Sequence, residues 1–209
     1  MSGVNIKHPR PRATWIAAPL LACALLTGCP AGGGGFTSDG GTLDGGLQPV
    51  FTAHDTAPSA QTLSMAPGTA GADTFQVRVL VTDFEGFFGA AFRVAFDPTV
   101  ARFDGFSAAG SFIEGVGIAT DFRAVADPGD AGLILVNATR QGQFAGVDAV
   151  GSQLLITLNF TATGATAGSP FSFDSATTRL VTTCPAPPAA CTDVPEANLT
   201  WSGGTLTSN

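Results

Sequence analysis

The sequence contains no tyrosine, and after Cys29 it contains no lysine and a single histidine, His54. His54 lies close to a Gly-rich segment, and neither an H-E-x-x-H motif nor a pair of histidine ligands can be assembled. The aspartates fall mostly at turns, where Asp is expected on conformational grounds alone. Hydrolysis by carboxylates alone is the one catalytic chemistry that the residue types leave open. We therefore expect no catalytic residues and no enzyme.

Basic residues are scarce. Three of the nine, Lys7, Arg10 and Arg12, precede Cys29, so six arginines face sixteen acidic residues in the rest of the chain, a net charge of −10. A nucleic-acid-binding protein needs a basic surface to neutralise phosphates, so this class is excluded. The same charge opposes direct binding to anionic lipids, and any contact with a membrane should come from a lipid anchor alone.

The N-terminus has the pattern of an export signal. A basic stretch that includes Lys7 precedes an apolar run over residues 15–26, interrupted by Pro19. That run is too short to span a bilayer, which needs about 20 apolar residues. It ends in Leu-Thr-Gly-Cys29, which matches the bacterial lipobox, in which the cysteine is acylated. We predict a signal peptide over residues 1–28 and lipidation at Cys29; the alternative is a secreted protein with a chance cysteine near its cleavage point.

Residues 29–47 are dominated by glycine, with serine and threonine between. Such a composition cannot build a core and predicts a flexible tether. Pro30 follows the cysteine, whereas an Asp there would resemble an inner-membrane retention signal. We expect an exported protein that is lipid-anchored to the cell envelope, at the outer membrane or the cell surface.

Residues 48–209 have the length of one domain and an all-β composition. Short apolar runs alternate with turn residues, as in residues 75–81, where Phe and Val occupy every second position. Asp127-Pro-Gly-Asp130 is a strong turn signal. We predict an antiparallel β-sandwich with about nine strands. The predicted strands cover residues 75–81, 88–96, 120–125, 132–139, 153–162, 170–173 and 199–206.

Two details of this prediction concern apolar residues. Phe84 and Phe87 fall between two predicted strands and Phe88 stands at the start of the second, so we expect the three together in a loop at that point, where they either cap the end of the core or form an exposed patch. Residues 133–136 and 154–156 are apolar at consecutive positions. These two strands are expected to be covered on both faces.

The segment around Gly89 resembles the third-strand signature of cohesin domains. Neighbouring motifs agree in order and spacing over residues 62–207, without a catalytic motif among them. The resemblance implies a cohesin-like, jelly-roll type of sandwich, and the superfamily also includes carbohydrate-binding modules. The matching segments are Met65-Ala-Pro67-Gly68, Asp73-Thr74-Phe75-x-Val77-x-Val79, Gly89-x-x-Phe92-x-Val94-x-Phe96-Asp97-Pro98-x-Val100, Gly132-Leu-Ile-Leu-Val136, Gly151-x-x-Leu154-Leu155-x-x-Leu158-x-Phe160-x-Ala162 and Gly203-Gly-Thr-Leu206.

The physical basis of the signature is structural. Residues at period two fill one face of a strand, proline ends the strand, and the aspartate before it fixes the turn. Cohesins bind dockerin modules in polysaccharide-degrading complexes, through a sheet face that includes the third strand. The resemblance therefore implies a protein partner, and places Ala91, Arg93 and Ala95 on the contact face. The polar residues that the best-known cohesins carry at the positions of Gly89 and Ala91 are missing, and Arg93 could equally be a solvated charge.

Two other functions stay open. A carbohydrate-binding module usually stacks sugars on exposed Trp or Tyr, but Trp201 is the only tryptophan after Cys29 and lies within a predicted strand. Polysaccharide is therefore an alternative partner to a dockerin. An envelope protein whose domain merely packs against its neighbours is the third reading, which the departures at Gly89 and Ala91 keep open.

Two cysteines remain in the domain. Cys184 and Cys191 flank a Pro-rich stretch, and exported proteins meet oxidising conditions, so we predict a disulfide on an insertion before the last strand. We expect no metal site at these cysteines and no cofactor, because further ligands are missing. A structural calcium ion is left open at Asp127 and Asp130, which flank a turn but lack the EF-hand spacing.

Overall fold

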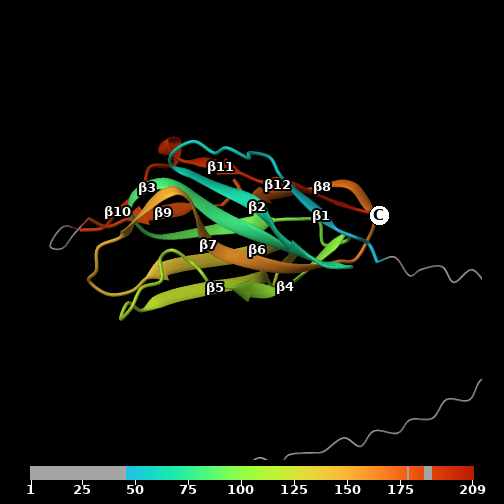
Figure 1. Cartoon of the computed structure of the whole chain (residues 1–209), viewed down its shortest axis with the longest axis horizontal. Coiled ribbons are helices and arrows are strands. Elements are labelled where there is room, and N and C mark those ends of the chain that lie inside the picture. The colour runs from blue at the N-terminus through green and yellow to red at the C-terminus, as the bar shows by residue number, and fades with distance from the viewer. Residues whose placement is uncertain (1–45, 178, 186–189) are drawn as a thin grey trace, which may run out of the picture. The chain divides into compact units, whose positions relative to one another are not determined.

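The computed structural model describes residues 46–177, 179–185 and 190–209. The predicted signal peptide, Cys29 and most of the tether lie outside these residues. The described part is a β-sandwich of twelve strands with one short 3-10 helix (Figure 1). None of its helices is long and apolar enough to cross a membrane. The elements are β1 (Val50–Ala53), β2 (Thr62–Ala70), β3 (Thr74–Ala95), β4 (Ala101–Ser107), β5 (Thr120–Asp127), β6 (Asp130–Arg140), β7 (Val147–Ala162), β8 (Thr166–Phe173), β9 (Leu180–Thr183), β10 (Thr192–Asp193), η1 (Glu196–Asn198), β11 (Thr200–Ser202) and β12 (Gly204–Ser208).

The all-β sandwich predicted from the sequence is confirmed, with more strands than the nine expected. Strand β3 belongs to both layers, because its first half pairs with β2 and β7 and its second half with β6 and β9. Strands β4 and β5 extend these layers at β7 and β6. Strands β1, β12 and β8 form a further ladder that joins β3 at its end. One pair, β11 with β2, is parallel, so the sandwich is not wholly antiparallel as predicted.

The predicted loop between residues 81 and 88 is wrong. Strand β3 runs through it without a break, since Phe84 pairs with Ala149 and Phe87 with Val147. The chain passes between the layers at Asp83 and Gly86, where φ is 48° and 62°. Glycine tolerates this left-handed conformation, and aspartate adopts it more readily than most residues. Phe84 and Phe87 are buried and Phe88 is half-buried, so the cluster closes the end of the core rather than forming an exposed patch.

The core between the layers is built largely from phenylalanine. Every second residue of β3 is buried over residues 75–81 and again over residues 90–94, as the alternation over residues 75–81 and the signature around Phe92 predicted. The rings of Phe75 and Phe160 stack at 5.2 Å, and Phe171 meets Phe160 edge-on at the same distance. Such aromatic pairs stabilise the fold by more than the burial of their apolar area alone. The signature therefore fixes the inner face of β3 and leaves its alternate residues pointing outward.

A tight turn follows β3, as the Asp97-Pro98 pair predicted. Asp97 Oδ1 accepts hydrogen bonds from the Thr99 backbone N–H at 2.8 Å and from the Thr99 hydroxyl at 2.7 Å. These bonds, the hydroxyl first, lower the pKa of the Asp97 carboxyl below its ordinary value, because they stabilise the charged form. The turn thus sets where β3 ends and where β4 begins.

The two ends of the domain lie side by side. The Leu47 N–H donates to Asp73 Oδ1 at 2.7 Å, and the Asn209 N–H donates to the Leu47 carbonyl at 2.9 Å. Strand β1 then pairs with β12 over its whole length. The C-terminus lies at the end of the domain opposite β9 and β10 (Figure 1).

Candidate functional site

The outward residues of the second half of β3, of β6, of β5 and of β9 form one open sheet surface, which we call the docking face. The β3 contribution consists of Gly89 and of the three residues predicted as contacts, Ala91, Arg93 and Ala95. Their neighbours in the strand, Phe92 and Val94, are buried at 3% and 0% exposure. The structure therefore brings the three predicted residues together on one surface.

The strand register places further side chains beside them. Ala91 lies opposite Asn137 of β6, which in turn lies opposite Arg123 of β5. In the next row, Arg93 lies opposite Leu135, and Leu135 lies opposite Val125. Because side chains on paired residues share a face, these rows form a continuous surface across three strands.

The centre of the docking face is a shallow, largely apolar depression of about 370 Å³. Val125 is 56% exposed there, and Leu135 is half-buried at its floor. Exposed apolar side chains that gather in one patch mark interaction sites more often than isolated ones do. The depression is lined by Ala91, Phe92, Arg93, Arg123, Val125, Leu135, Val136 and Asn137.

Two arginines flank this depression, and each is held by an aspartate of β5. Arg93 Nη1 lies 3.5 Å from Asp127 Oδ2, and Arg123 Nε lies 3.2 Å from Asp121 Oδ1. Asp121 also accepts a hydrogen bond from the Asn137 amide at 3.4 Å. Exposed ion pairs of this kind contribute little stability. They orient guanidinium groups that remain open to a partner, which suits a polar rim around an apolar centre.

The sequence did not identify Arg123, Val125 and Leu135 as candidate contacts. The consecutive apolar residues 133–136 predicted a strand covered on both faces, and this is wrong for β6. Ile134 and Val136 are buried, whereas Leu133 and Leu135 are half-buried on the docking face. On β7, where residues 154–156 were expected to be covered on both faces, Leu155 and Ile156 are buried and Leu154 is half-buried. A register shift opposite Val79 and Leu80 accompanies the consecutive burial.

The two aspartates considered as calcium ligands, Asp127 and Asp130, form hydrogen bonds within the β5–β6 turn. Asp127 Oδ1 accepts from the Gly129 N–H at 2.8 Å, and Asp130 Oδ1 accepts from the Gly132 N–H at 2.9 Å. Within the described ranges, no three His, Cys, Asp or Glu side chains are grouped so that they could hold a metal ion. His54 lies elsewhere, where its Nε2 is 2.8 Å from the Thr205 hydroxyl.

Trp201 is placed for packing rather than for stacking against a sugar. Its ring is half-buried, with centroids 6.0 Å from Phe92 and 5.0 Å from Phe173. The Arg179 guanidinium lies 4.9 Å from the ring centroid and forms an ion pair with Glu196. The indole is thus enclosed by protein groups, and its face is not presented as a platform for a ligand.

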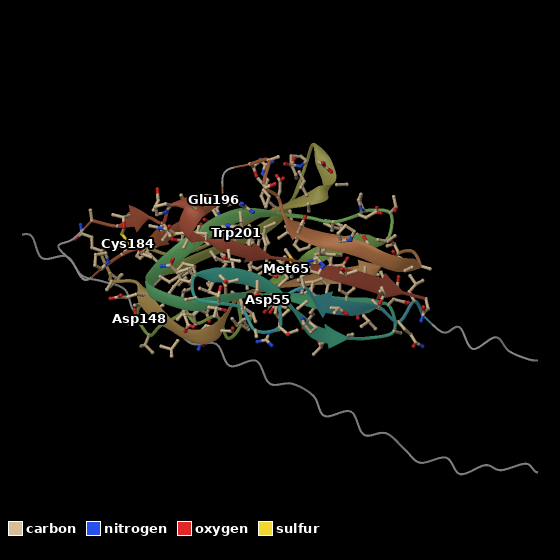
Figure 2. The ribbon with its side chains drawn as sticks, turned by 90° about the horizontal axis from the view of Figure 1, so that it is seen from above. Asp55, Met65, Asp148, Cys184, Glu196 and Trp201 are labelled. Carbon is tan, nitrogen blue, oxygen red and sulfur yellow. A yellow bond between two sulfur atoms is a disulfide. The ribbon has the colours of Figure 1, made fainter. Side chains whose placement is uncertain are left out.

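The predicted disulfide between Cys184 and Cys191 is confirmed. It joins the segments that follow β9 and precede β10, which pair as Thr183 with Thr192. Cys184 and Asp148 lie at the same end of the domain (Figure 2). The insertion predicted before the last strand is therefore a stapled hairpin at the β9 edge of the docking face.

No protein-family model matches the chain, and no curated protein matches it. Among solved structures, the seventh ScaB type I cohesin from Pseudobacteroides cellulosolvens has a TM-score of 0.50, with 14% identity over 68% of this chain and 88% of that one. A type II cohesin in a cohesin-X-dockerin complex from Acetivibrio cellulolyticus has a TM-score of 0.47, with 11% identity over 59% and 86%. A cohesin module of a Clostridium perfringens family 33 glycoside hydrolase has a TM-score of 0.44, with 12% identity over 76% and 96%. The likeness at a TM-score of 0.50 shows that this domain has a cohesin-like fold.

Proposed function

We propose that this chain is a non-catalytic, lipid-anchored envelope protein whose docking face recruits a protein partner of the dockerin type. The observation that carries the proposal is the docking face itself. It combines an apolar centre at the exposed Val125 and the half-buried Leu135 with two oriented arginines, on the signature segment of β3 and the strands beside it. An apolar centre with a polar rim is the usual anatomy of a protein–protein interface.

The proposed anchor would be joined to the domain through the predicted tether. The tether of residues 29–47 reaches the domain at Leu47, which is bonded to Asp73 and Asn209. A Gly-rich chain of this length has a root-mean-square span of about 25 Å. An acyl group on Cys29 would therefore hold the domain near a membrane. Two or more acyl chains are needed for stable anchoring.

The test is a binding experiment on the full-length protein, purified in detergent and immobilised. A panel of purified dockerin modules with duplicated calcium loops is passed over it, in calcium and then in a chelator. Insoluble polysaccharides are offered to the same protein in parallel. We expect saturable binding of at least one dockerin that is lost on chelation.

Two matched valine variants test whether the dockerin binds at the docking face. Val125→Asp places a charge in the depression, whereas Val150→Asp places the same charge at a 77% exposed position near the start of β7. The first should abolish dockerin binding and the second should leave it unchanged. If the protein binds a polysaccharide and no dockerin, a carbohydrate-binding function replaces this proposal. If the two variants affect dockerin binding equally, the binding surface is not the docking face.

A further inference from the structure

Strands β9 and β10, with Cys184 and Cys191 at their ends, form a projection that we call the β9–β10 arm. Strand β9 pairs with β3, so that Thr182 lies opposite Gly89 and Leu180 lies opposite Ala91. Strand β10 pairs with β9, so that Asp193 lies opposite Thr182. The arm therefore widens the docking face beyond β3 by two strands, on the side away from β5.

The arm carries acceptor groups on the docking face. The Thr182 hydroxyl donates to Asp193 Oδ1 at 2.9 Å, which places both side chains on the same side of the ladder. Gly89 next to them has no side chain, and a Cβ there would lie 2.6 Å from Thr139 Oγ1. In this row of the face, the Thr139 side chain lies over the buried backbone of Gly89, and the carboxylate of Asp193 lies on the outermost strand.

Asp193 differs from the aspartates of β5. Asp121 and Asp127 each face an arginine of the docking face, whereas the ion pairs found in the described part of the chain do not include Asp193. Asp193 is exposed. Its charge is therefore available to a cationic group that approaches the docking face.

The negative character continues around the end of the arm. A depression of about 570 Å³ lies beside Thr183 and Thr192 and includes the carboxylates of Glu85 and Asp148. Six arginines stand against fourteen acidic residues over residues 46–209, and four of those six are already in ion pairs. A basic partner is therefore attracted toward this side of the domain, and complementary charge of this kind raises association rates.

The arm is held rigidly to the body of the domain. The Cys184 N–H donates to the Gly86 carbonyl at 2.9 Å, and the Gly146 N–H donates to the Cys184 carbonyl at 2.8 Å. Within the arm, the Val194 N–H donates to the Val181 carbonyl at 2.8 Å. The disulfide closes the arm between these points. A surface that is already ordered loses little conformational entropy on binding.

We propose that the β9–β10 arm is part of the partner-binding surface, and that Asp193 on it pairs with a lysine or arginine side chain of the partner. The inference rests on the proposed function of the docking face, and it names the partner's chemistry at one edge of that face. The arginines near β5 would meet acceptor groups of the same partner, so that the charges on the docking face also fix the partner's orientation.

The test uses the full-length protein and the dockerin of the panel that binds it most tightly. Asp193→Asn removes the charge and keeps a hydrogen-bond acceptor for Thr182. Asp104→Asn is the matched control, because Asp104 on β4 also accepts a threonine hydroxyl, from Thr161 at 2.6 Å, but lies off the docking face. We expect Asp193→Asn to raise the Kd roughly two- to fivefold and to weaken its dependence on salt, as for the loss of one exposed ion pair. Asp104→Asn should do neither.

Hydrogen exchange gives a second readout that depends on neither variant. The backbone amides of residues 180–184 and 191–194 should exchange more slowly in the complex than in the free protein. A wild-type Kd in Asp193→Asn, or unchanged exchange over the arm, overturns this inference and leaves the proposed function standing if Val125→Asp still abolishes binding. If the wild-type protein binds no dockerin of the panel, both the proposed function and this inference fall.

Discussion

Arg93 on β3 and Asp127 at the end of β5 form an ion pair across the intervening strand β6, with 3.5 Å between Nη1 and Oδ2. The pair fixes the Arg93 side chain over the docking face, next to Leu135. Because both groups are partly exposed, the pair adds little to the stability of the fold. Its contribution should appear in binding.

Replacing Arg93 with alanine should separate these two contributions. We expect the Kd for the dockerin identified above to rise about five- to tenfold, equivalent to about 1–1.4 kcal/mol. The free energy of unfolding in urea should change by less than about 1 kcal/mol. Arg102→Ala serves as the control, since its pair with Asp104 lies on β4. Equal Kd values for the two variants would argue against a role for Arg93 in binding.

Replacing Phe92 with alanine should act mainly on the stability of the fold. Phe92 is buried, and its ring lies 5.2 Å from that of Phe173. Truncation leaves a cavity in a close-packed core, and we expect a loss of about 3–5 kcal/mol in the free energy of unfolding. Urea denaturation followed by circular dichroism measures it. A loss below about 1 kcal/mol would show that this part of the core does not pack as the structure has it.

The turn after β3 predicts a specific pKa change. Thr99→Val removes the hydroxyl that donates to Asp97, so the pKa of Asp97 should move up toward its ordinary value while the backbone hydrogen bond remains. A carboxyl with a lowered pKa in the folded state contributes stability above its unfolded pKa, and this contribution is lost as the pH falls through the lowered value. The difference in free energy of unfolding between the wild type and the variant should therefore shrink as the pH drops below about 4. Titration of the Asp97 carboxyl carbon by NMR measures the shift, and an unchanged pKa would refute its assigned cause.

The proposed lipid anchor is tested at Cys29. In cells that process bacterial lipoproteins, the wild-type protein should partition into the detergent phase, and Cys29→Ser should remain unacylated and lose this behaviour. Intact mass should place acyl chains on a protein that begins at Cys29. The double variant Cys184→Ser/Cys191→Ser is the control, because it removes only the disulfide of the β9–β10 arm. Detergent partitioning of Cys29→Ser at the wild-type level would exclude lipidation at this residue.

The sequence predicted what depends on local pattern. Alternation with period two placed Phe92 inward and Arg93 outward, and Cys184 and Cys191 could be paired because they are the two cysteines that remain in a domain predicted to be exported. It could not predict which strands pair with each other, because strand pairing depends on contacts between residues that are far apart in the chain. Arg123 and Val125 therefore became candidates only once β5 was seen to pair with β6.

Two further errors have physical causes. The stretch around Phe84 carries turn-forming Asp and Gly, yet hydrogen-bonded pairing with residues 147–149 keeps it within β3. Strand β10 is two residues long and has no periodicity to detect. Its place beside β9 follows from the disulfide and from the hydrogen bond between Thr182 and Asp193.

The hydrogen bond between Asn209 and Leu47 has a consequence for how this domain can be combined with others. A unit whose entry and exit points touch can be inserted into a loop of another protein without forcing that loop apart, and domain insertion succeeds at such sites. The β9–β10 arm lies at the opposite end (Figure 1). Inserted in this way, the domain would be attached to the host protein at one end and would leave the β9–β10 arm free at the other.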